Sequence, residues 1–392
     1  MKILIASDCY TNNTNGVTTS ILALSSALRR LGHEVKILSL SDSSRSFRSG
    51  DDYFIKSFPS LYYPDLRTSL VIKDPLLDEL TAWKPDVVHV HTDGSSHRMA
   101  LKIRKQCGVP LVKTCHTYYE YFAFGRFSTL PPLKVLSRFV GGRLYQQADI
   151  VTVPSYKSTG FSFLEKMSDR LVVIHNGIEL DKYRNRFSEE ERRAFRRHMG
   201  IEDHTGTLVT ITRLSREKHI HELISFLPGL LKKNRDVKYL IVGDGPDSRH
   251  LKKLTGKLNL QNNVIFTGRI PDGDVWRFYA AGDIYAADSI CEVNSMSCIE
   301  AMANGLPLLC RADESLNGVL DHGQNGLIWH SREEFVDFTC RLLEDSRLRE
   351  NMARSSLEKA GSFSSDAYAS AMLEVYTSAI HGSQTGSPGA AP

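Results

Sequence analysis

Short apolar runs alternate with longer amphipathic stretches along nearly the whole chain, and this alternation constrains the fold more than any other feature. The runs are rich in Val, Ile and Leu, as expected of strands that are buried on both faces of a parallel sheet. They form two series, which predicts an α/β protein with two doubly wound sheets. The expected strands are Ile3–Ala6, Val35–Leu40, Val87–His91, Leu111–Thr114, Ile150–Val153 and Leu171–Ile174 in the first series, and Thr207–Ile211, Tyr239–Val242, Val264–Thr267, Ile284–Ala286 and Pro307–Cys310 in the second.

Amphipathic segments between these runs predict helices, and a turn-forming stretch at His175–Ile178 separates the two series. We therefore expect an N-terminal domain over residues 1–175, completed by a C-terminal helix at about 366–380, and a second domain over residues 176–361. The Gly-, Ser- and Pro-rich end, residues 382–392, is expected to be disordered. The main helices expected between the strands are Thr18–Leu31, Ser69–Ala82, Leu133–Gln147, Ile220–Lys232 and Cys298–Ala303.

The excess of basic residues is confined to the first half of the chain. Residues 1–175 contain 22 Lys and Arg against 15 Asp and Glu, whereas residues 176–392 contain 27 against 30. Such an asymmetry favours an anionic partner for the first half, either a membrane surface or a nucleic acid. Scattered, solvated side chains would give the same counts.

The composition also argues against several classes of protein. No apolar run approaches the roughly 18 residues that cross a membrane. The cysteines are seven in number, and no two of them form a C-x-x-C pair. We therefore expect reduced thiols in the cytosol, and neither a disulfide framework nor a zinc cluster.

Polar loops follow several expected strands, at the edge of a doubly wound sheet where ligands bind. The loop from Tyr10 to Gly16 has neither the G-x-G-x-x-G nor the phosphate-loop pattern, which argues against an NAD-dependent dehydrogenase. Arg213 and Lys218 stand between a strand and a helix and can converge on a diphosphate, Arg as a fork and Lys as a point charge. Taken alone, each loop also fits an ordinary surface turn.

Two glutamates, Glu292 and Glu300, flank the beginning of another expected helix, which the second of them opens. They suit the two ends of an elongated ligand, with the intervening N–H groups directed at phosphate. A helix with an acidic N-terminal turn and no ligand is the alternative. The tight turn Val242-Gly-Asp-Gly-Pro246 is weak evidence for a further phosphate loop.

The order of these motifs is typical of one enzyme family. Arg-x4-Lys, Gly-x-Gly-Pro, Thr267-Gly-Arg-Ile270 and Glu-x7-Glu with Glu-Ala-Met-Ala-x-Gly-x-Pro follow one another between about residues 205 and 330. This order resembles the C-terminal domain of the retaining glycosyltransferases of family 4. Their GT-B fold has two Rossmann-like domains that face each other across a cleft. Leu31-Gly-His-Glu-Val35, Pro85–His91 and His175–Ile178 resemble motifs of the N-terminal domain of the same family.

The resemblance implies a site for a nucleoside-diphosphate sugar. Cationic side chains bind the diphosphate, a carboxylate binds the ribose hydroxyls, and backbone groups contact the base and the phosphates. Ser295 and Met296 stand where the family usually has a Gly-Leu pair. The donor-binding residues implied are Gly16, Arg213, Lys218, Ile270, Asn294, Ser295, Met296, Ser297 and Glu300.

The resemblance also implies two residues beside the reacting sugar. His116 faces the donor sugar near its anomeric carbon, and Glu292 bonds the sugar hydroxyls. No carboxylate is an obvious nucleophile, so the resemblance implies a front-face displacement in which the leaving diphosphate helps to deprotonate the acceptor.

One motif points to a subgroup of the family. His116-Thr-Tyr-Tyr-Glu-Tyr121 is similar to the corresponding motif of diacylglycerol glucosyltransferases. Aromatic and aliphatic residues alternate with basic ones from Phe122 to Gln147, without a single acid. This pattern suits an element that lies on anionic lipid, and it equally suits a core-facing helix with a basic outer face. The implied acceptor and membrane residues are Tyr119, Glu120, Arg126, Lys134, Arg138 and Arg143.

We expect no metal ion or other cofactor. Asp272-Gly-Asp274 has the spacing of a metal-binding D-x-D motif, but it precedes an amphipathic run and fits helix capping better. His89 and His91 lie on an expected strand, and we predict that their rings point to opposite faces. His219 and His221 have no third ligand nearby in the sequence.

The sequence thus predicts a retaining hexosyltransferase that moves a hexose, glucose from UDP-glucose, to a membrane lipid such as 1,2-diacylglycerol. We expect it in the cytoplasm, bound to the inner face of the cell membrane and not to nucleic acid. One rival is a family 4 enzyme of cell-wall polysaccharide or teichoic-acid synthesis. Another is a non-catalytic nucleotide-sugar-binding protein, against which the joint presence of His116, Glu292, Arg213 and Lys218 argues.

Overall fold

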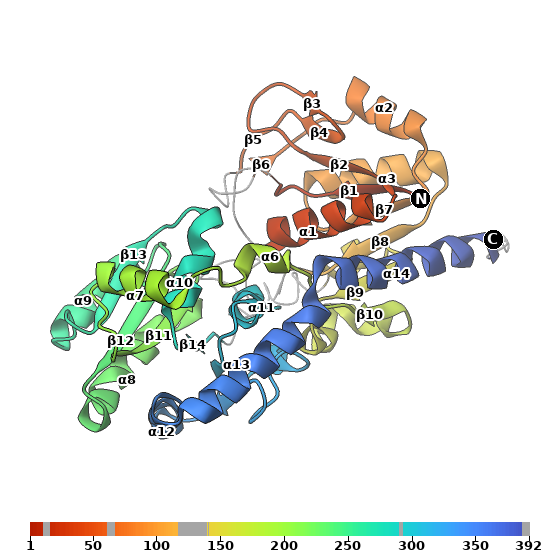
Figure 1. Ribbon diagram of the computed structural model, residues 1–392. Helices are drawn as coiled ribbons and strands as arrows, with labels where there is room; N and C mark the ends of the chain where they lie inside the picture. Colours follow the sequence, from red (N-terminus) through yellow and green to blue (C-terminus); the bar gives the residue numbers. More distant parts are fainter. Residues whose placement is uncertain (11–15, 61–66, 117–138, 140, 290–292, 386–392) are drawn as a thin grey trace. The chain divides into compact units, whose positions relative to one another are not determined.

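The computed structural model describes residues 1–392 apart from 11–15, 61–66, 117–138, 140, 290–292 and 386–392 (Figure 1). The chain forms two compact units, each built on its own sheet. The N-terminal unit contains Met1–Gly177 and the chain from Ser365 onwards, and the C-terminal unit contains Ile178–Ser364. The first division lies within the expected turn, and the second lies at Ser364 where the sequence suggested 361.

The sheet of the N-terminal unit has the strand order β10-β9-β8-β7-β1-β2-β4-β3. All neighbours are parallel except β3 and β4, which are antiparallel. The chain leaves β1 in one direction and returns to β7 on its other side, so the strand order reverses beside β1, where such sheets bind ligands. The strands are β1 (Lys2–Ala6), β2 (Glu34–Leu40), β3 (Phe47–Ser49), β4 (Asp52–Ile55), β7 (Val87–Val90), β8 (Leu111–Thr114), β9 (Ile150–Val153) and β10 (Leu171–Val173), and a separate ribbon joins β5 (Phe58–Pro59) and β6 (Arg67–Thr68).

The last helix of the chain belongs to the core of this first unit. Helix α14 (Ser365–Thr385) packs against α1 (Gly16–Arg30). It buries Tyr368, Met372 and Tyr376 in the same apolar cluster as Leu24 and Leu28 of α1. The other main helices of the unit are α2 (Pro75–Trp83) and α3 (Ser95–Cys107).

Two expected limits in this unit are wrong. The helix expected from Ser69 begins at Pro75, because the Asp74 side chain accepts a hydrogen bond from Leu76 N–H at 3.0 Å and Pro75 suits the first helical position. Residues 382–385, expected to be disordered, are the end of α14. The rest of that tail, and the expected helix Leu133–Gln147 up to residue 138, lie outside the described residues.

The C-terminal unit is a parallel sheet with the order β13-β12-β11-β14-β15-β16, which again reverses beside the first strand. Side chains of α8, α9 and α12 form the apolar cluster on one face, and those of α10 and α11 the cluster on the other. The elements are β11 (Gly206–Ile211), β12 (Val237–Val242), β13 (Val264–Gly268), β14 (Ile284–Ala287), β15 (Leu308–Arg311), β16 (Gly326–Trp329), α6 (Leu180–Tyr183), α7 (Glu189–His198), α8 (Ile220–Lys233), α9 (Ser248–Lys257), α10 (Val275–Ala281), α11 (Met296–Ala303), α12 (Arg332–Glu344) and α13 (Ser346–Ala360).

Candidate active site

A pocket lies at the carboxyl ends of β11, β14 and β15 in the C-terminal unit. This is the edge at which doubly wound sheets bind ligands, because loops and helix N-termini meet there. Most of the lining groups are polar, and two of them are cations. The lining residues are Thr210, Thr212, Lys218, Tyr285, Ala287, Asp288, Ser289, Ser295, Ser297, Cys298, Cys310, Arg311, Ser315 and Leu316.

Of the two cations expected to bind diphosphate, Lys218 lines this pocket and Arg213 is exposed on the loop just before it. That loop lies on the glycine turn after β12. The backbone N–H groups of Thr212 and Leu214 donate to carbonyls of that turn, both at 3.0 Å. A Cβ atom at Gly243 would lie 2.0 Å from the Thr212 carbonyl oxygen, and one at Gly245 would lie 2.4 Å from that of Leu214. The two glycines are therefore required by this backbone contact.

The beginning of α11 forms another wall of the pocket. Ser297 accepts a hydrogen bond from the Tyr285 hydroxyl at 2.7 Å, and Ser295 donates to the Cys298 thiol at 3.0 Å. The Asn294 side-chain oxygen is buried and has no hydrogen-bond partner among the described residues. Polar atoms thus gather where the sequence predicts phosphate contacts.

Glu300 lies in the second turn of α11, so the expectation that it opens the helix is wrong. Its Oε2 accepts a hydrogen bond from the Tyr279 hydroxyl at 2.8 Å. Burial raises the pKa of Glu300 to about 7, although hydrogen bonds from Tyr279 and Tyr183 oppose the shift. The tyrosines come from α10 and α6, and nothing in the sequence marks them as partners of Glu300. Ile270, expected to contact the base, packs at the margin of the apolar cluster beneath α10 and α11.

A charged cluster borders the same pocket. Arg311 Nη1 lies 3.2 Å from Asp288 Oδ1 and 3.6 Å from Glu222 Oε2. Burial raises the pKa of Asp288 to about 7, with a contribution from the Glu222 charge, while Arg311 opposes the shift. Sequence reasoning did not identify Asp288 or Arg311, because their partner Glu222 comes from a distant helix.

In the N-terminal unit, His116 follows β8 and is hydrogen-bonded to a second histidine. Its Nε2 lies 2.9 Å from Nδ1 of His91, and the rings are stacked with centroids 5.2 Å apart. The His89 ring lies 4.0 Å from that of His91 and bonds Thr114 at 2.7 Å and Tyr376 at 2.8 Å. The expectation that His89 and His91 point to opposite faces is wrong, because residues two apart on a strand share a face.

Burial keeps these imidazoles neutral at physiological pH. It lowers the pKa of His116 to about 4, with the Asp93 carboxylate opposing, and it lowers the pKa of His89 to about 3. The pKa of His91 is also lowered by burial. A neutral His116 has one donor and one acceptor nitrogen, which suits hydrogen bonding to a hydroxyl group.

The first loop of this unit is anchored by a half-buried carboxylate. Asp8, just after β1, accepts hydrogen bonds from the N–H groups of Gly94 at 3.0 Å and Ser96 at 2.8 Å, at the beginning of α3. Burial raises the pKa of Asp8, and these hydrogen bonds oppose the shift. Gly16 is exposed as the first residue of α1, and the loop before it lies outside the described residues.

Several predicted site residues lie outside the described residues: Glu292, Tyr119, Glu120, Arg126, Lys134 and Arg138. Arg143 is described, and its guanidinium lies 4.8 Å from the centre of the exposed Phe139 ring. Asp274 of the D-x-D motif stands at the N-cap of α10, as expected, but its side chain makes no capping hydrogen bond. Asp272 pairs with Lys182, and Asp274 lies 3.3 Å from Arg277.

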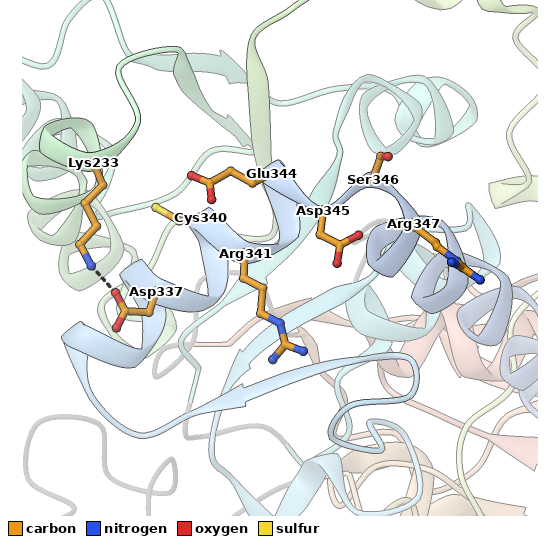
Figure 2. Close-up of a pocket in the computed structure, with 8 residues that line it drawn as sticks. All are labelled: Lys233, Asp337, Cys340, Arg341, Glu344, Asp345, Ser346 and Arg347. Atoms are coloured by element: carbon orange, nitrogen blue, oxygen red, sulfur yellow. Dashed lines mark hydrogen bonds and ion pairs between the residues drawn. The ribbon is translucent and has the colours of Figure 1, made fainter.

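A second hollow is open to solvent near the turn between α12 and α13 (Figure 2). Lys233, Asp337 and Arg341 line it with other charged residues, and Lys233 pairs with Asp337. Lys233 ends α8, and the neighbouring Leu343 lies against Gly206 at the beginning of β11. The hollow therefore lies at the amino edge of the sheet, away from the pocket.

Two family models match the chain, one over most of each unit. The model described as Glycosyltransferase Family 4 matches residues 14–182, and Glycosyl transferases group 1 matches residues 191–359. The chain is a family 4 glycosyltransferase of the GT-B fold. Solved structures that share the fold of this glycosyltransferase include HepE of Anabaena with UDP and glucose, at a TM-score of 0.75 and 19% identity over 96% of this chain and 100% of that one. Another is sucrose-phosphate synthase of Thermosynechococcus elongatus, at a TM-score of 0.75 and 18% identity over 97% and 99%.

Two curated relatives of this glycosyltransferase match it over nearly its whole length. Both are named alpha-monoglucosyldiacylglycerol synthase. The protein from Streptococcus pneumoniae is 28% identical over 97% of this chain and 86% of its own length. The protein from Acholeplasma laidlawii is 24% identical over 97% and 98%. Among the described residues of this glycosyltransferase, no helix is long and apolar enough to cross a bilayer.

Proposed function

We propose that this glycosyltransferase moves glucose from UDP-glucose to diacylglycerol in a membrane, with retention of the anomeric configuration. The observation that carries the proposal is the match to two synthases of monoglucosyldiacylglycerol over 97% of the chain. A UDP-linked donor is supported by HepE, a protein of the same fold that has been solved with UDP and with UDP-glucose.

In this proposal, Arg213 and Lys218 stabilise the negative charge that develops on the leaving diphosphate. Lys218 lines the pocket beside Ser295 and Ser297, at the sheet edge where anions meet helix N-termini. Cations that are already fixed in place need no reorganisation during the reaction. They therefore stabilise the charge that develops in the transition state more than water molecules would. The transfer step itself then needs no metal ion.

The nucleoside of the donor is also assigned to the C-terminal unit. Glu300 binds the ribose hydroxyls, and backbone groups at Ile270 contact the base. The Tyr279 hydroxyl donates to Oε2 of Glu300, and Tyr183 also hydrogen-bonds this carboxyl, so the two tyrosines hold the group that is assigned to the ribose. The N–H groups from Asn294 to Ser297, together with Gly16, are assigned to the phosphates.

The transfer is proposed as a front-face displacement. The bond between the anomeric carbon and the diphosphate oxygen breaks, and the acceptor oxygen bonds to that carbon on the same face. The acceptor proton passes to the leaving diphosphate, so no carboxylate nucleophile is needed. His116, held neutral by burial and hydrogen-bonded to His91, is assigned to a sugar hydroxyl, and Glu292 to the others.

A membrane acceptor fits the charge of the N-terminal half, with 22 basic residues against 15 acidic ones. Each basic side chain near an anionic bilayer contributes about 1 kcal/mol, which decays with screening by salt. Arg126, Lys134, Arg138 and Arg143, with Tyr119 and Glu120 nearer the acceptor, are the proposed contacts. Several such residues hold a protein on a surface reversibly, on the cytoplasmic face in this proposal.

The test uses vesicles of phosphatidylglycerol that contain diacylglycerol, with radiolabelled UDP-glucose as the donor. We expect α-linked glucosyldiacylglycerol. The α-linkage is identified by the coupling constant between the anomeric proton and the proton on the neighbouring ring carbon. Replacing Arg213 or Lys218 with Ala removes one charge from the leaving-group site. We expect turnover to fall by about two to three decades.

The exposed Arg347→Ala is the matched control, because it removes one cation from the same unit at the opposite edge of the sheet. Reversing the charge at Arg126, Lys134 and Arg138 is expected to release the enzyme from the vesicles and to affect transfer to a detergent-dispersed acceptor much less. Transfer to a polysaccharide or teichoic-acid acceptor, with none to diacylglycerol, would contradict the lipid assignment. Unchanged turnover in folded Arg213→Ala would contradict the roles of the cations.

A further inference from the structure

Three groups that commonly bind metal ions meet at the margin of the pocket. One ligand atom from each of His219, Glu222 and Asp288 lies within 4.8 Å of the other two. His219 and Glu222 stand at the beginning of α8, and Asp288 follows β14. Because β11 and β14 are neighbours in the sheet, the fold brings these distant segments of the sequence together.

Two atoms of this cluster are buried without hydrogen-bond partners among the described residues. They are Oδ2 of Asp288, whose side chain is fully buried, and Nδ1 of His219. The His219 atom lies 3.8 Å from Glu222 Oε1, too far for a hydrogen bond. A buried carboxylate oxygen and a buried ring nitrogen both cost free energy when they lack partners. One shared cation would satisfy both.

Arg311 holds the other oxygen of each carboxylate. Its Nη1 lies 3.2 Å from Asp288 Oδ1 and 3.6 Å from Glu222 Oε2, so Glu222 Oε1 and Asp288 Oδ2 remain available to a ligand. In many proteins, a group that bonds the second oxygen of a carboxylate ligand orients that ligand toward the metal ion.

We propose that His219, Glu222 and Asp288 bind a divalent cation of the zinc or manganese type. One imidazole and two carboxylates are ligands that these ions accept. Bond lengths of roughly 2.0–2.2 Å place the ligand atoms of one ion about 3–3.5 Å apart, so the side chains must approach by about an ångström. The bound ion fastens the beginning of α8, directly after Lys218, to the end of β14. It supports the pocket and takes no part in the transfer.

The test is a titration of the full-length protein, freed of metal by a chelator, with Zn²⁺ in a calorimeter and with Co²⁺ as a spectroscopic probe. We expect one saturable equivalent per chain and a Co²⁺ spectrum of nitrogen and oxygen ligands without a thiolate charge-transfer band. Asp288→Asn, His219→Ala and Glu222→Gln should each weaken binding at least tenfold. Zn²⁺ should raise the unfolding temperature of the unaltered protein, and it should raise that of the three variants much less.

His330→Ala is the matched control. His330 Nδ1 lies 3.3 Å from Glu334 on the surface of the same unit, and no third ligand joins this pair among the described residues. Replacing His330 should leave the affinity for Zn²⁺ and the number of Zn²⁺ ions bound per chain unchanged. Glu222 is partly exposed, so Glu222→Gln is expected to fold even if Asp288→Asn does not. Absence of saturable binding, equal affinity in Glu222→Gln, or a thiolate band from a nearby cysteine would each overturn the proposal.

Discussion

His116, a predicted site residue, depends on neighbouring side chains for its orientation and for its pKa. Its ring is stacked on His91, which is itself packed against His89, and His89 is hydrogen-bonded to Thr114 and Tyr376. Each imidazole is kept neutral by the burial that the others help to create. In the proposed mechanism, His91 is therefore a positioning residue and His116 is the residue that contacts the sugar.

Replacing His91 with Ala tests this division of roles. We expect kcat to fall by about one to two decades, because His116 loses the hydrogen bond that fixes its ring, while KM for the donor changes little. Water admitted beside His116 should also raise its pKa from about 4 towards the ordinary value, so the acid limb of the rate profile should move to higher pH. His91→Gln, which keeps a hydrogen-bonding group, should restore part of the rate. A uniform loss of rate at every pH would indicate a structural role only.

At the scale of elements, the sequence predicts the central strands of each sheet better than the strands near its edges. Buried parallel strands appear in the sequence as apolar runs. The strands at the centres of both sheets lie within two residues of their expected limits. The short β3, β4 and β16, at or next to the edges of the two sheets, are not among the predicted strands. β3 contains a single apolar residue, Phe47, and β4 and β16 contain apolar runs of only three, Tyr53–Ile55 and Leu327–Trp329.

The candidate site shows the same division. Lys218, Ser295 and Ser297 were predicted from motifs, and the fold brings them into one pocket. Asp288, Arg311 and Tyr279 were not predicted, because their roles arise from contacts between segments far apart in the sequence. For His89 and His91, the period of two residues along a strand already places both rings on one face.

The glycine turn after β12 permits a prediction at this scale. A Cβ atom at Gly245 would lie 2.4 Å from the Leu214 carbonyl oxygen, so Gly245→Ala must displace the loop that carries Arg213. We expect a loss of about 1–3 kcal/mol in the free energy of unfolding and a larger fractional loss of turnover. Gly256→Ala in α9 is the control, since the nearest atom, in Gln261, is 3.9 Å away and alanine favours the helix. Denaturant titration and initial rates measure both effects, and equal behaviour of the two variants would contradict the argument.

At the scale of the whole molecule, the two units differ in the balance of groups whose pKa is shifted by burial: histidines predominate in the N-terminal unit and carboxyls in the C-terminal unit. In the described part of the N-terminal unit, burial lowers the pKa of five histidines, at positions 33, 89, 91, 97 and 116, and raises that of Asp8. In the C-terminal unit, it raises the pKa of Glu300 and Asp288 to about 7 and lowers that of His219.

These shifts predict which unit loses stability on each side of neutrality. A histidine with a lowered pKa binds its proton more readily when unfolded, so its unit loses stability as pH falls below about 6.5. For a fully buried histidine the loss is on the order of 2 kcal/mol at pH 5. A carboxyl with a raised pKa has the opposite effect, because stability falls as pH rises from about 4 to about 7. Hydrogen exchange at pH 5 and pH 8 should therefore show the N-terminal unit relatively more open at pH 5. The reverse order would contradict the assignment of these shifts.

The place of α14 in the N-terminal unit has a consequence for synthesis on the ribosome. Domains usually fold in the order in which they emerge, at about 5–20 residues per second. Here the second unit is continuous, from Ile178 to Ser364, whereas the first lacks Tyr368, Met372 and Tyr376 until the end of the chain has been translated. The unit translated second can thus be completed first. Until α14 emerges, the nascent first unit exposes the apolar surface of α1, and it is there that a chaperone would bind.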